Sequence, residues 1–286
     1  MRKSAYWAVC VVLLAPLTAL AILAMTHQQG PELDKEMSQA IQKAPVTIRK
    51  EAKQGHAAAE TKLGLAYYAG RGVPQNYAKG NYWFQKAADQ GYAAAEFDLG
   101  AAYHYGRGVP QNYAKAVYWY RKAADQGYAD AEYDLGAVYN YGLGVPQNYA
   151  KAVYWYRKAA SQGLAAAENN LGLAYHYGRG VPQDYAKGNY WYQKAADQGY
   201  ALSEFNLGVT YYAGRGVPQN YAKAVYWYQK AASQGLAAAE NNLGVAYYYG
   251  LGVPQNSMTA LHWLKKAAAQ GVQIAEHMVQ VIEHGK

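Results

Sequence analysis

The chain has 286 residues, of which 52% are hydrophobic and 16% charged, and this balance excludes an intrinsically disordered polymer. Its formal net charge is +8, but the basic residues form no clustered patch within a nucleic-acid-binding motif, so nucleic acid is not expected as a partner. Cys10 is the only cysteine, which excludes a disulfide framework.

The first expected element is an N-terminal leader, residues 1–26. Arg2 and Lys3 precede the uncharged and mostly apolar stretch 5–25. Two alternatives fit this stretch: a cleaved signal peptide, with small residues around Ala19 at the cut, or an uncleaved inner-membrane anchor of about 20 apolar residues. Either one places the rest of the chain in the periplasm or outside the cell.

Residues 27–55 are expected to form a linker and an N-terminal cap. Gly30 and Pro31 begin this segment, and Pro45 interrupts any helix there. Residues 48–55 (IRKEAKQG) are similar to residues 121–127 further along the chain. We therefore expect them to cover the open end of the structure that follows.

Six Val-Pro pairs then mark a fixed internal period of 36 residues. Their prolines are Pro74, Pro110, Pro146, Pro182, Pro218 and Pro254. The full units run 56–91, 92–127, 128–163, 164–199, 200–235 and 236–271. A period of this length is typical of a solenoid, in which each repeat needs only its neighbours for stability.

Each unit is predicted to form two helices, as the second unit illustrates. The first helix runs from about Tyr92 to Tyr105 and ends at Gly106, because glycine adopts a positive φ without penalty. After a turn, Asn112 caps the second helix with its side-chain oxygen, and that helix ends near Gln126. The same capping place is held by Asn76, Asn148, Asn220, Asn256 and Asp184.

The chain is predicted to end in a C-terminal cap helix, residues 272–286. Ala275 and Glu276 repeat the Ala-Glu pair of each unit, but the following Leu-Gly pair is lost. Terminal repeats of solenoids are expected to be atypical in this way.

Comparison of the six units separates two faces of the first helix. Glu96, Leu99 and Gly100 have unchanged counterparts in every unit and share about 100° of arc, the width of a packed helix face. The positions of Asp98 and His104 vary and lie on the opposite side. One face therefore does the same task in every repeat, while the other differs from unit to unit.

The recurring residues are expected to be structural. Gly100 allows close approach of two helices, and Glu96 is expected to pair with recurring lysines such as Lys122. The recurring aromatic residues are expected in the core: Trp83, Trp119, Trp155, Trp191, Trp227 and Trp263, with Tyr67, Tyr103, Tyr139, Tyr175, Tyr211 and Tyr247.

The run A-E-x-x-L-G-x-x-Y-x-x-G-x-G-V-P-x-N-x-x-K-A-x-x-W-x-x-K-A-A-x-Q-G resembles the Sel1-like repeat, a relative of the tetratricopeptide repeat, and the match covers residues 56–271. This resemblance implies an all-α, right-handed α/α solenoid whose first helices line a concave surface. It also implies a scaffold for protein complexes, often in bacterial envelopes or in bacteria that contact host cells. Cysteine-rich relatives have been linked to β-lactam binding or hydrolysis, but this sequence lacks their cysteines in every unit.

The candidate binding residues lie on the varying face of the first helices, where tyrosine and asparagine side chains suit recognition. They are Tyr68, His104, Tyr105, Tyr133, Asn140, Tyr141, Asn170, His176, Tyr177, Asn206, Tyr212, Asn242, Tyr248 and Tyr249. No catalytic residue, cofactor site or metal site is predicted, because His104 and His176 have a whole repeat between them and no nucleophile motif is present.

These features favour a non-enzymatic interaction scaffold of the bacterial envelope that binds a partner peptide or helix in its groove. The alternative is a solenoid that binds cell-wall glycans, since tyrosine and asparagine also suit sugars. A hydrolase acting on β-lactams or cell-wall material is the third hypothesis and has no catalytic constellation to support it.

Overall fold

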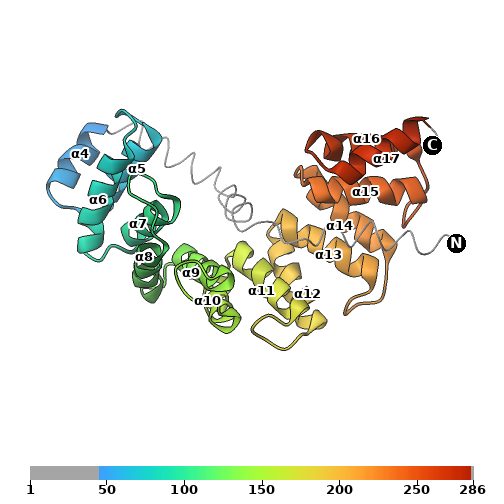
Figure 1. Cartoon of the computed structure of the whole chain (residues 1–286), viewed down its shortest axis with the longest axis horizontal. Helices are drawn as coiled ribbons and strands as arrows, with labels where there is room; N and C mark the ends of the chain where they lie inside the picture. The colour runs from blue at the N-terminus through green and yellow to red at the C-terminus, as the bar shows by residue number, and fades with distance from the viewer. Residues whose placement is uncertain (1–44, 285–286) are drawn as a thin grey trace. The chain divides into compact units, whose positions relative to one another are not determined.

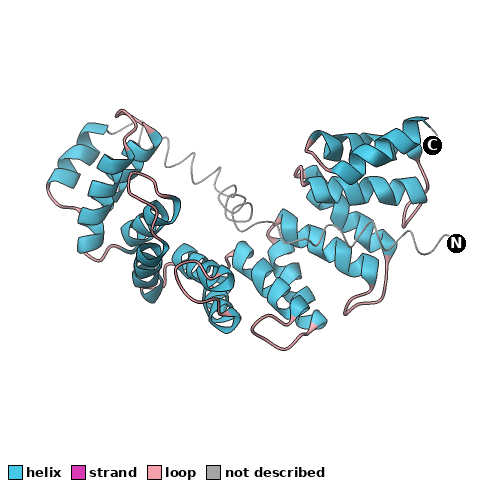
Figure 2. Ribbon diagram, in the orientation of Figure 1, coloured by secondary structure: helices cyan, strands magenta, loops and turns pink. Residues whose placement is uncertain are grey.

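The computed structural model describes residues 45–284. The expected leader and the linker up to residue 44 lie outside these residues. Residues 45–284 form 14 helices and no strand (Figures 1 and 2). The helices are α4 Pro45–Lys53, α5 Ala57–Ala69, α6 Tyr77–Asp89, α7 Ala93–Tyr105, α8 Tyr113–Asp125, α9 Ala129–Tyr141, α10 Tyr149–Ser161, α11 Ala165–Tyr177, α12 Tyr185–Asp197, α13 Ala201–Ala213, α14 Tyr221–Ser233, α15 Ala237–Tyr249, α16 Ser257–Ala269 and α17 Gln273–His284.

The described residues fall into two units, 45–167 and 168–284, and each is treated by itself. Within each unit a helix packs mainly on the next helix of the chain. The pairs α7–α8 and α13–α14 are the two helices of one repeat, and the pairs α8–α9 and α14–α15 join successive repeats. The expected all-α solenoid of helix–turn–helix repeats is confirmed. In this part of the chain, none of the helices has the length and apolar character that crossing a membrane requires.

The expected helix ends are confirmed. The side chain of Asn112 accepts a hydrogen bond of 2.9 Å from the backbone N–H of Lys115, and Asp184 does the same for Lys187 at 2.9 Å. Gly106 follows the first helix with φ of +67°, the left-handed conformation that glycine adopts freely. These local signals fix where each helix begins and ends.

Both ends of the described chain carry an additional helix. Pro45, expected to interrupt a helix, is the first residue of α4, a position where its missing N–H costs nothing. Ala52 of α4 is fully buried and clusters with Leu63 of the first repeat. At the other end, Ala275 and Met278 of α17 are buried in a cluster with α16.

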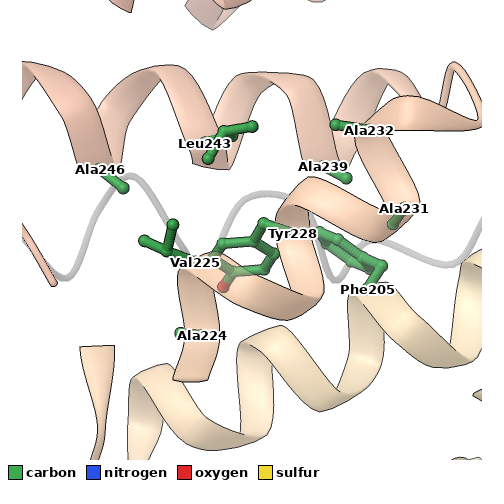
Figure 3. Close-up of a cluster of buried hydrophobic side chains, with 9 residues drawn as sticks. All are labelled: Phe205, Ala224, Val225, Tyr228, Ala231, Ala232, Ala239, Leu243 and Ala246. Atoms are coloured by element: carbon green, nitrogen blue, oxygen red, sulfur yellow. The ribbon is translucent and has the colours of Figure 1, made fainter. Parts of the chain in front are cut away.

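The core of each of the first five repeats is built on a contact between an aromatic ring and a glycine, and in the sixth repeat Leu264 takes the place of the ring against Gly244. In the unit 168–284, Tyr228 of α14 is 2% exposed and lies with Phe205 of α13 and Leu243 of α15 (Figure 3). A Cβ added to Gly208 of α13 would overlap the Tyr228 ring. The recurring glycine therefore lets the two helices of a repeat approach closely, as the sequence predicted.

A buried carboxylate fastens the ends of the two helices in every repeat. Glu96 is fully buried; its Oε1 lies 3.1 Å from Lys122 Nζ, and its Oε2 accepts a hydrogen bond of 2.6 Å from Gln126. The same two contacts recur for the glutamate of each other repeat. The predicted pairing of glutamate with lysine is confirmed.

The expectation of a fully aromatic core is only partly right. Trp155 and Trp227 are buried, at 8% and 9% exposed, and so is Tyr139. The other recurring tryptophans and tyrosines of these two sets are partly exposed. A lysine ammonium covers one side of each such tryptophan, as Lys122 covers Trp119 at 4.9 Å from the ring centroid, so these rings lie at the edge of the core.

Candidate functional site

The 14 predicted binding residues do not share one environment. Tyr177 and Tyr249 are exposed, at 41% and 42%. Eight are half-buried: Tyr68, Tyr105, Asn140, Tyr141, Asn170, Asn206, Tyr212 and Tyr248. The remaining four, His104, Tyr133, His176 and Asn242, are between 5% and 6% exposed. These four side chains are therefore parts of the packed interior, and only the other ten are available to a ligand.

His104 illustrates why variation between repeats did not mean exposure. Its ring lies 5.2 Å from the ring of Tyr113, edge to face, and 4.7 Å from Tyr105. Burial lowers the pKa of this histidine, because the charged form is poorly solvated there. We infer a neutral, packed side chain rather than a groove residue.

In the first repeat a hydrogen-bond network holds Tyr68 in place. The Tyr68 hydroxyl donates to Asn81 Oδ1 at 2.5 Å, and Asn81 Nδ2 donates to the carbonyl oxygen of Arg107 at 2.7 Å. A Cβ on Gly80 would overlap the Tyr68 ring. The network therefore ties the first repeat to the turn of the second.

The fourth repeat repeats this arrangement with histidine in place of tyrosine. His176 Nε2 lies 2.8 Å from Asn189 Oδ1, and Asn189 Nδ2 donates to the carbonyl oxygen of Arg215 at 2.8 Å. Thr210 Oγ1 also donates to Asn189 Oδ1 at 3.2 Å. A Cβ on Gly188 would overlap the His176 ring.

A Gly-Asn pair in the second helix is the sequence signal for these networks, and no prediction was based on it. Gly80-Asn81 and Gly188-Asn189 stand where the second, third and fifth repeats have Ala-Val. The glycine leaves room for the ring of Tyr68 or His176, and the asparagine side chain makes a hydrogen bond to that residue. Tyr68 and His176 are thus positioned by the fold rather than free to adapt to a ligand.

The two units differ in their side chains at one position of the varying face, where one unit has carboxyl groups and the other has amide groups in the equivalent places. Asp98 and Asp134 occupy equivalent places in the unit 45–167, whereas Asn206 and Asn242 hold that place in the unit 168–284. Burial, with the neighbouring Asp130 charge, raises the pKa of Asp134 to about 7, and the Tyr120 hydroxyl opposes this shift. Burial alone raises the pKa of Asp98 to about 8.

In the unit 168–284, amide groups bond to one another instead. Asn169 Oδ1 accepts hydrogen bonds of 3.0 Å from both Ser203 Oγ and Asn206 Nδ2. Asn241 Nδ2 donates to Asn242 Oδ1 at 3.2 Å. The asparagines Asn206 and Asn242 are thus partly engaged within the fold, which leaves the tyrosines as the more accessible groups of this face.

The accessible tyrosines lie at the C-terminal ends of the first helices, since Tyr105, Tyr177 and Tyr249 are the last residues of α7, α11 and α15. The guanidinium of Arg107, in the adjoining turn, lies 5.1 Å from the Tyr105 ring, and Arg179 lies 5.2 Å from Tyr177. Tyr249 meets Tyr248 edge to face at 4.8 Å. Flat rings with a nearby cation can contact a partner over a large area at small entropy cost.

A second accessible set, on the second helices, was missed by the sequence analysis. Five tyrosines at one repeat position are more exposed than any other tyrosine of residues 45–284: Tyr82 at 59%, Tyr118 and Tyr154 at 56%, Tyr190 at 57% and Tyr226 at 54%. Each is followed in sequence by a recurring tryptophan. No prediction was made for this position, which holds tyrosine in five repeats and His262 in the sixth.

A cationic pocket lies between α4 and the first repeat. Its volume is about 330 Å³, and its walls include the rings of Tyr67 and Trp83 and the side chains of Arg49, Lys53 and Lys79. The Arg49 guanidinium donates to the carbonyl oxygen of Gly72 at 2.9 Å. Residues 45–284 contain no group of three or more His, Cys, Asp or Glu side chains that could hold a metal ion.

Comparison with known proteins identifies the repeat. The Sel1 repeat family model matches residues 57–92, 93–128, 129–164, 165–200, 201–236 and 237–272. No curated protein matched the sequence.

Two solved structures are similar over most of the chain. One is a protective antigen present in uropathogenic Escherichia coli strains, with 39% identity over 83% of this chain and a TM-score of 0.79. The chain spans 51% of that protein. The other is a Sel1 repeat protein from Oxalobacter formigenes, with 36% identity over 82% of this chain, 68% of the other chain and a TM-score of 0.74.

Proposed function

This chain belongs to the Sel1 repeat family, and from that premise we propose that it is a non-enzymatic scaffold of the bacterial cell envelope whose first helices bind a partner protein. Proteins of this family generally mediate protein–protein interactions, and the fold is typically a scaffold without catalytic activity. The envelope assignment rests on the basic and apolar N-terminal sequence.

One observation carries the proposal: accessible side chains on a constant framework differ from repeat to repeat. The exposed rings of Tyr177 and Tyr249 stand where the first and fifth repeats have Ala69 and Ala213. Aromatic side chains that are rigid and partly exposed are typical anchors of protein interfaces. A partner that presents an extended peptide or one helix would bind along this surface and recognise which repeats carry an exposed tyrosine.

The test is photo-crosslinking in cells that express the full chain. A photoreactive amino acid replaces Tyr177 or Tyr249, and in a matched control it replaces Met258, which is 80% exposed on α16. We expect a discrete crosslinked protein from the two first-helix positions and not from residue 258. His104 and His176 are unsuitable positions because they are buried.

A Tyr177→Ala/Tyr249→Ala variant should then lose co-purification of the crosslinked protein by at least about tenfold, as loss of two anchor side chains predicts. The same protein captured equally well from residue 258, or no crosslink from either tyrosine position, would contradict the proposal.

A further inference from the structure

The row of exposed tyrosines on the second helices has a geometry that is the same in five repeats. Each ring meets the following tryptophan edge to face, with centroids 5.0–5.3 Å apart and interplanar angles of 75–80°. The unit 45–167 carries three of them, Tyr82, Tyr118 and Tyr154, on α6, α8 and α10. We call these three residues the tyrosine row.

The tyrosine row is not required by the core. More than half of each side chain is exposed, from 56% to 59%, and tyrosine is a weaker helix former than lysine, glutamate or alanine at an exposed position. The equivalent residue of the sixth repeat is His262, which is also exposed and meets Trp263 in the same manner. The fold thus accepts other residues here.

The recurrence of one exposed tyrosine per repeat limits the kind of ligand that this surface can bind. One identical ring per repeat offers the same contact at regular steps along the stacked second helices. A globular partner without internal repeats has no such translational repeat, whereas a linear polymer does. Successive weak contacts with a polymer add through effective concentration, so three rings bind far better than one.

The surroundings of the rings argue against nucleic acid. The ammonium groups that lie near two of the rings, Lys86 near Tyr82 and Lys122 near Tyr118, are already paired with buried carboxylates. Lys86 Nζ lies 3.3 Å from Glu60 Oε1, and Lys122 Nζ lies 3.1 Å from Glu96 Oε1. Nucleic-acid binding depends on cations that are free to replace counterions along the phosphates. Because each of these lysines is paired with a glutamate, it is not available to replace counterions along a phosphate backbone.

The surroundings also argue against insertion into a membrane. The exposed large hydrophobic residues of 45–284 are tyrosines, Val46 and Met258. No leucine, isoleucine, phenylalanine or tryptophan is among them, although such residues form the inserted face of interfacial helices. A sugar chain matches better, since the flat C–H face of a pyranose ring stacks on tyrosine while its hydroxyls reach the phenol and neighbouring polar groups.

We propose that the tyrosine row Tyr82, Tyr118 and Tyr154 binds a linear polysaccharide, one sugar contact per repeat. This surface is separate from the first-helix positions assigned to a protein partner. The protein would then hold a glycan on its second helices and a protein on its first helices.

The test is native electrophoresis of the full chain in gels that contain hydroxyethyl cellulose, glycol chitin or alginate, with a polymer-free gel as reference. These probes present neutral, N-acetylated and acidic sugar chains and so also identify the class. We expect at least one polymer to retard the wild type. Tyr82→Ala/Tyr118→Ala/Tyr154→Ala is made in a Tyr190→Ala/Tyr226→Ala background, so that no other ring of this kind remains. Relative to that background it should weaken the affinity by about a hundredfold, because linked contacts are lost together, and Tyr118→Ala alone should weaken it less.

Two matched variants separate stacking from general effects. Replacement of the same three residues by phenylalanine should keep most of the affinity, because the rings remain. Tyr177→Ala/Tyr249→Ala, which removes exposed tyrosines of the first helices, should not change it. Thermal unfolding should change little in the variants of the tyrosine row, since more than half of each of these side chains is exposed.

Retardation that survives the triple alanine variant, an equal loss in the Tyr177/Tyr249 variant, or no retardation of the wild type by any polymer would overturn the proposal. So would binding confined to duplex DNA or to anionic lipid vesicles run in parallel. None of these results bears on the protein partner, whose crosslinking test uses other positions.

Discussion

At the scale of single residues, the recurring tryptophans differ in how much they stabilise the fold. Trp155 is 8% exposed, whereas Trp83 is partly exposed. Trp155→Ala should lower the free energy of unfolding by about 3–5 kcal/mol, as for other buried aromatic residues, and Trp83→Ala by less. Urea denaturation measures both, and equal losses would contradict the burial argument.

Asp134 makes stability depend on pH. Its pKa is raised to about 7 in the folded protein, while an unfolded aspartate titrates near about 3.9. The folded state therefore holds a proton that the unfolded state has lost between these two values, so this residue's contribution is complete below about pH 4 and falls as the pH rises to about 7. Asp98 acts in the same direction, with a pKa of about 8.

Asp98→Asn/Asp134→Asn should flatten the decline of the thermal midpoint between pH 4 and pH 8 and raise the midpoint at the upper end. Asparagine is tolerated here because Asn206 and Asn242 occupy the equivalent places. The control is Asp89→Asn/Asp125→Asn, at exposed positions. If both double variants give the same pH profile, the two buried carboxyls are not its cause.

How much the sequence predicted depends on how local each signal is. The caps, the positive-φ glycines and the Glu96–Lys122 pair were predictable, because each depends on a few residues of one repeat. The burial of His104 was not, because it depends on how the second helix packs above it. The exposure of Tyr82 was not predicted either, because its tyrosine recurs in five of the six repeats and recurrence alone does not distinguish a repeated surface from a core.

At the scale of helices, the Gly-Asn pairs select one of two ways to pack the first helix on the second. His176 bonds to Asn189 over Gly188. The second repeat has Ala116 and Val117 at these two positions, and its His104 packs against the rings of Tyr113 and Tyr120. Gly188→Ala alone would displace the His176 ring and leave the buried Asn189 with fewer partners, at a cost of about 1–3 kcal/mol.

Gly188→Ala/Asn189→Val gives the fourth repeat the residues that the second repeat has at these two positions, Ala116 and Val117. We expect this pair to cost less than the sum of the two single changes, because His176 can then pack as His104 does. Unfolding free energies of the four proteins form a double-mutant cycle. Strict additivity would mean that the two positions do not select the packing together.

At the scale of the whole molecule, stability is assembled from contacts between neighbours. The Glu96–Lys122–Gln126 cluster lies within one repeat, and the Asn81–Arg107 bond reaches only the next one. Each contact uses either a recurring side chain or a backbone carbonyl. A repeat should therefore be removable if the new junction restores the same partners.

Deletion of residues 92–127 tests this directly. It joins Gly91 to Tyr128, and the native junction at that place is Gly91-Tyr92, the same dipeptide. Asn81 would meet the carbonyl oxygen of Leu143 in place of that of Arg107, since both follow the first glycine of the same turn. We expect circular dichroism to show unchanged helicity per residue.

The same deletion shortens the tyrosine row from three rings to two, because Tyr118 is lost. Polysaccharide affinity should therefore fall by about tenfold or more through the lost linked contact, while the protein remains folded. A deletion variant with normal helicity and full affinity would show that the rings do not act together along a polymer. Loss of helicity throughout the chain would instead show that the repeats are coupled beyond their neighbours, because contacts limited to adjacent repeats give a deletion no means of unfolding the distant ones.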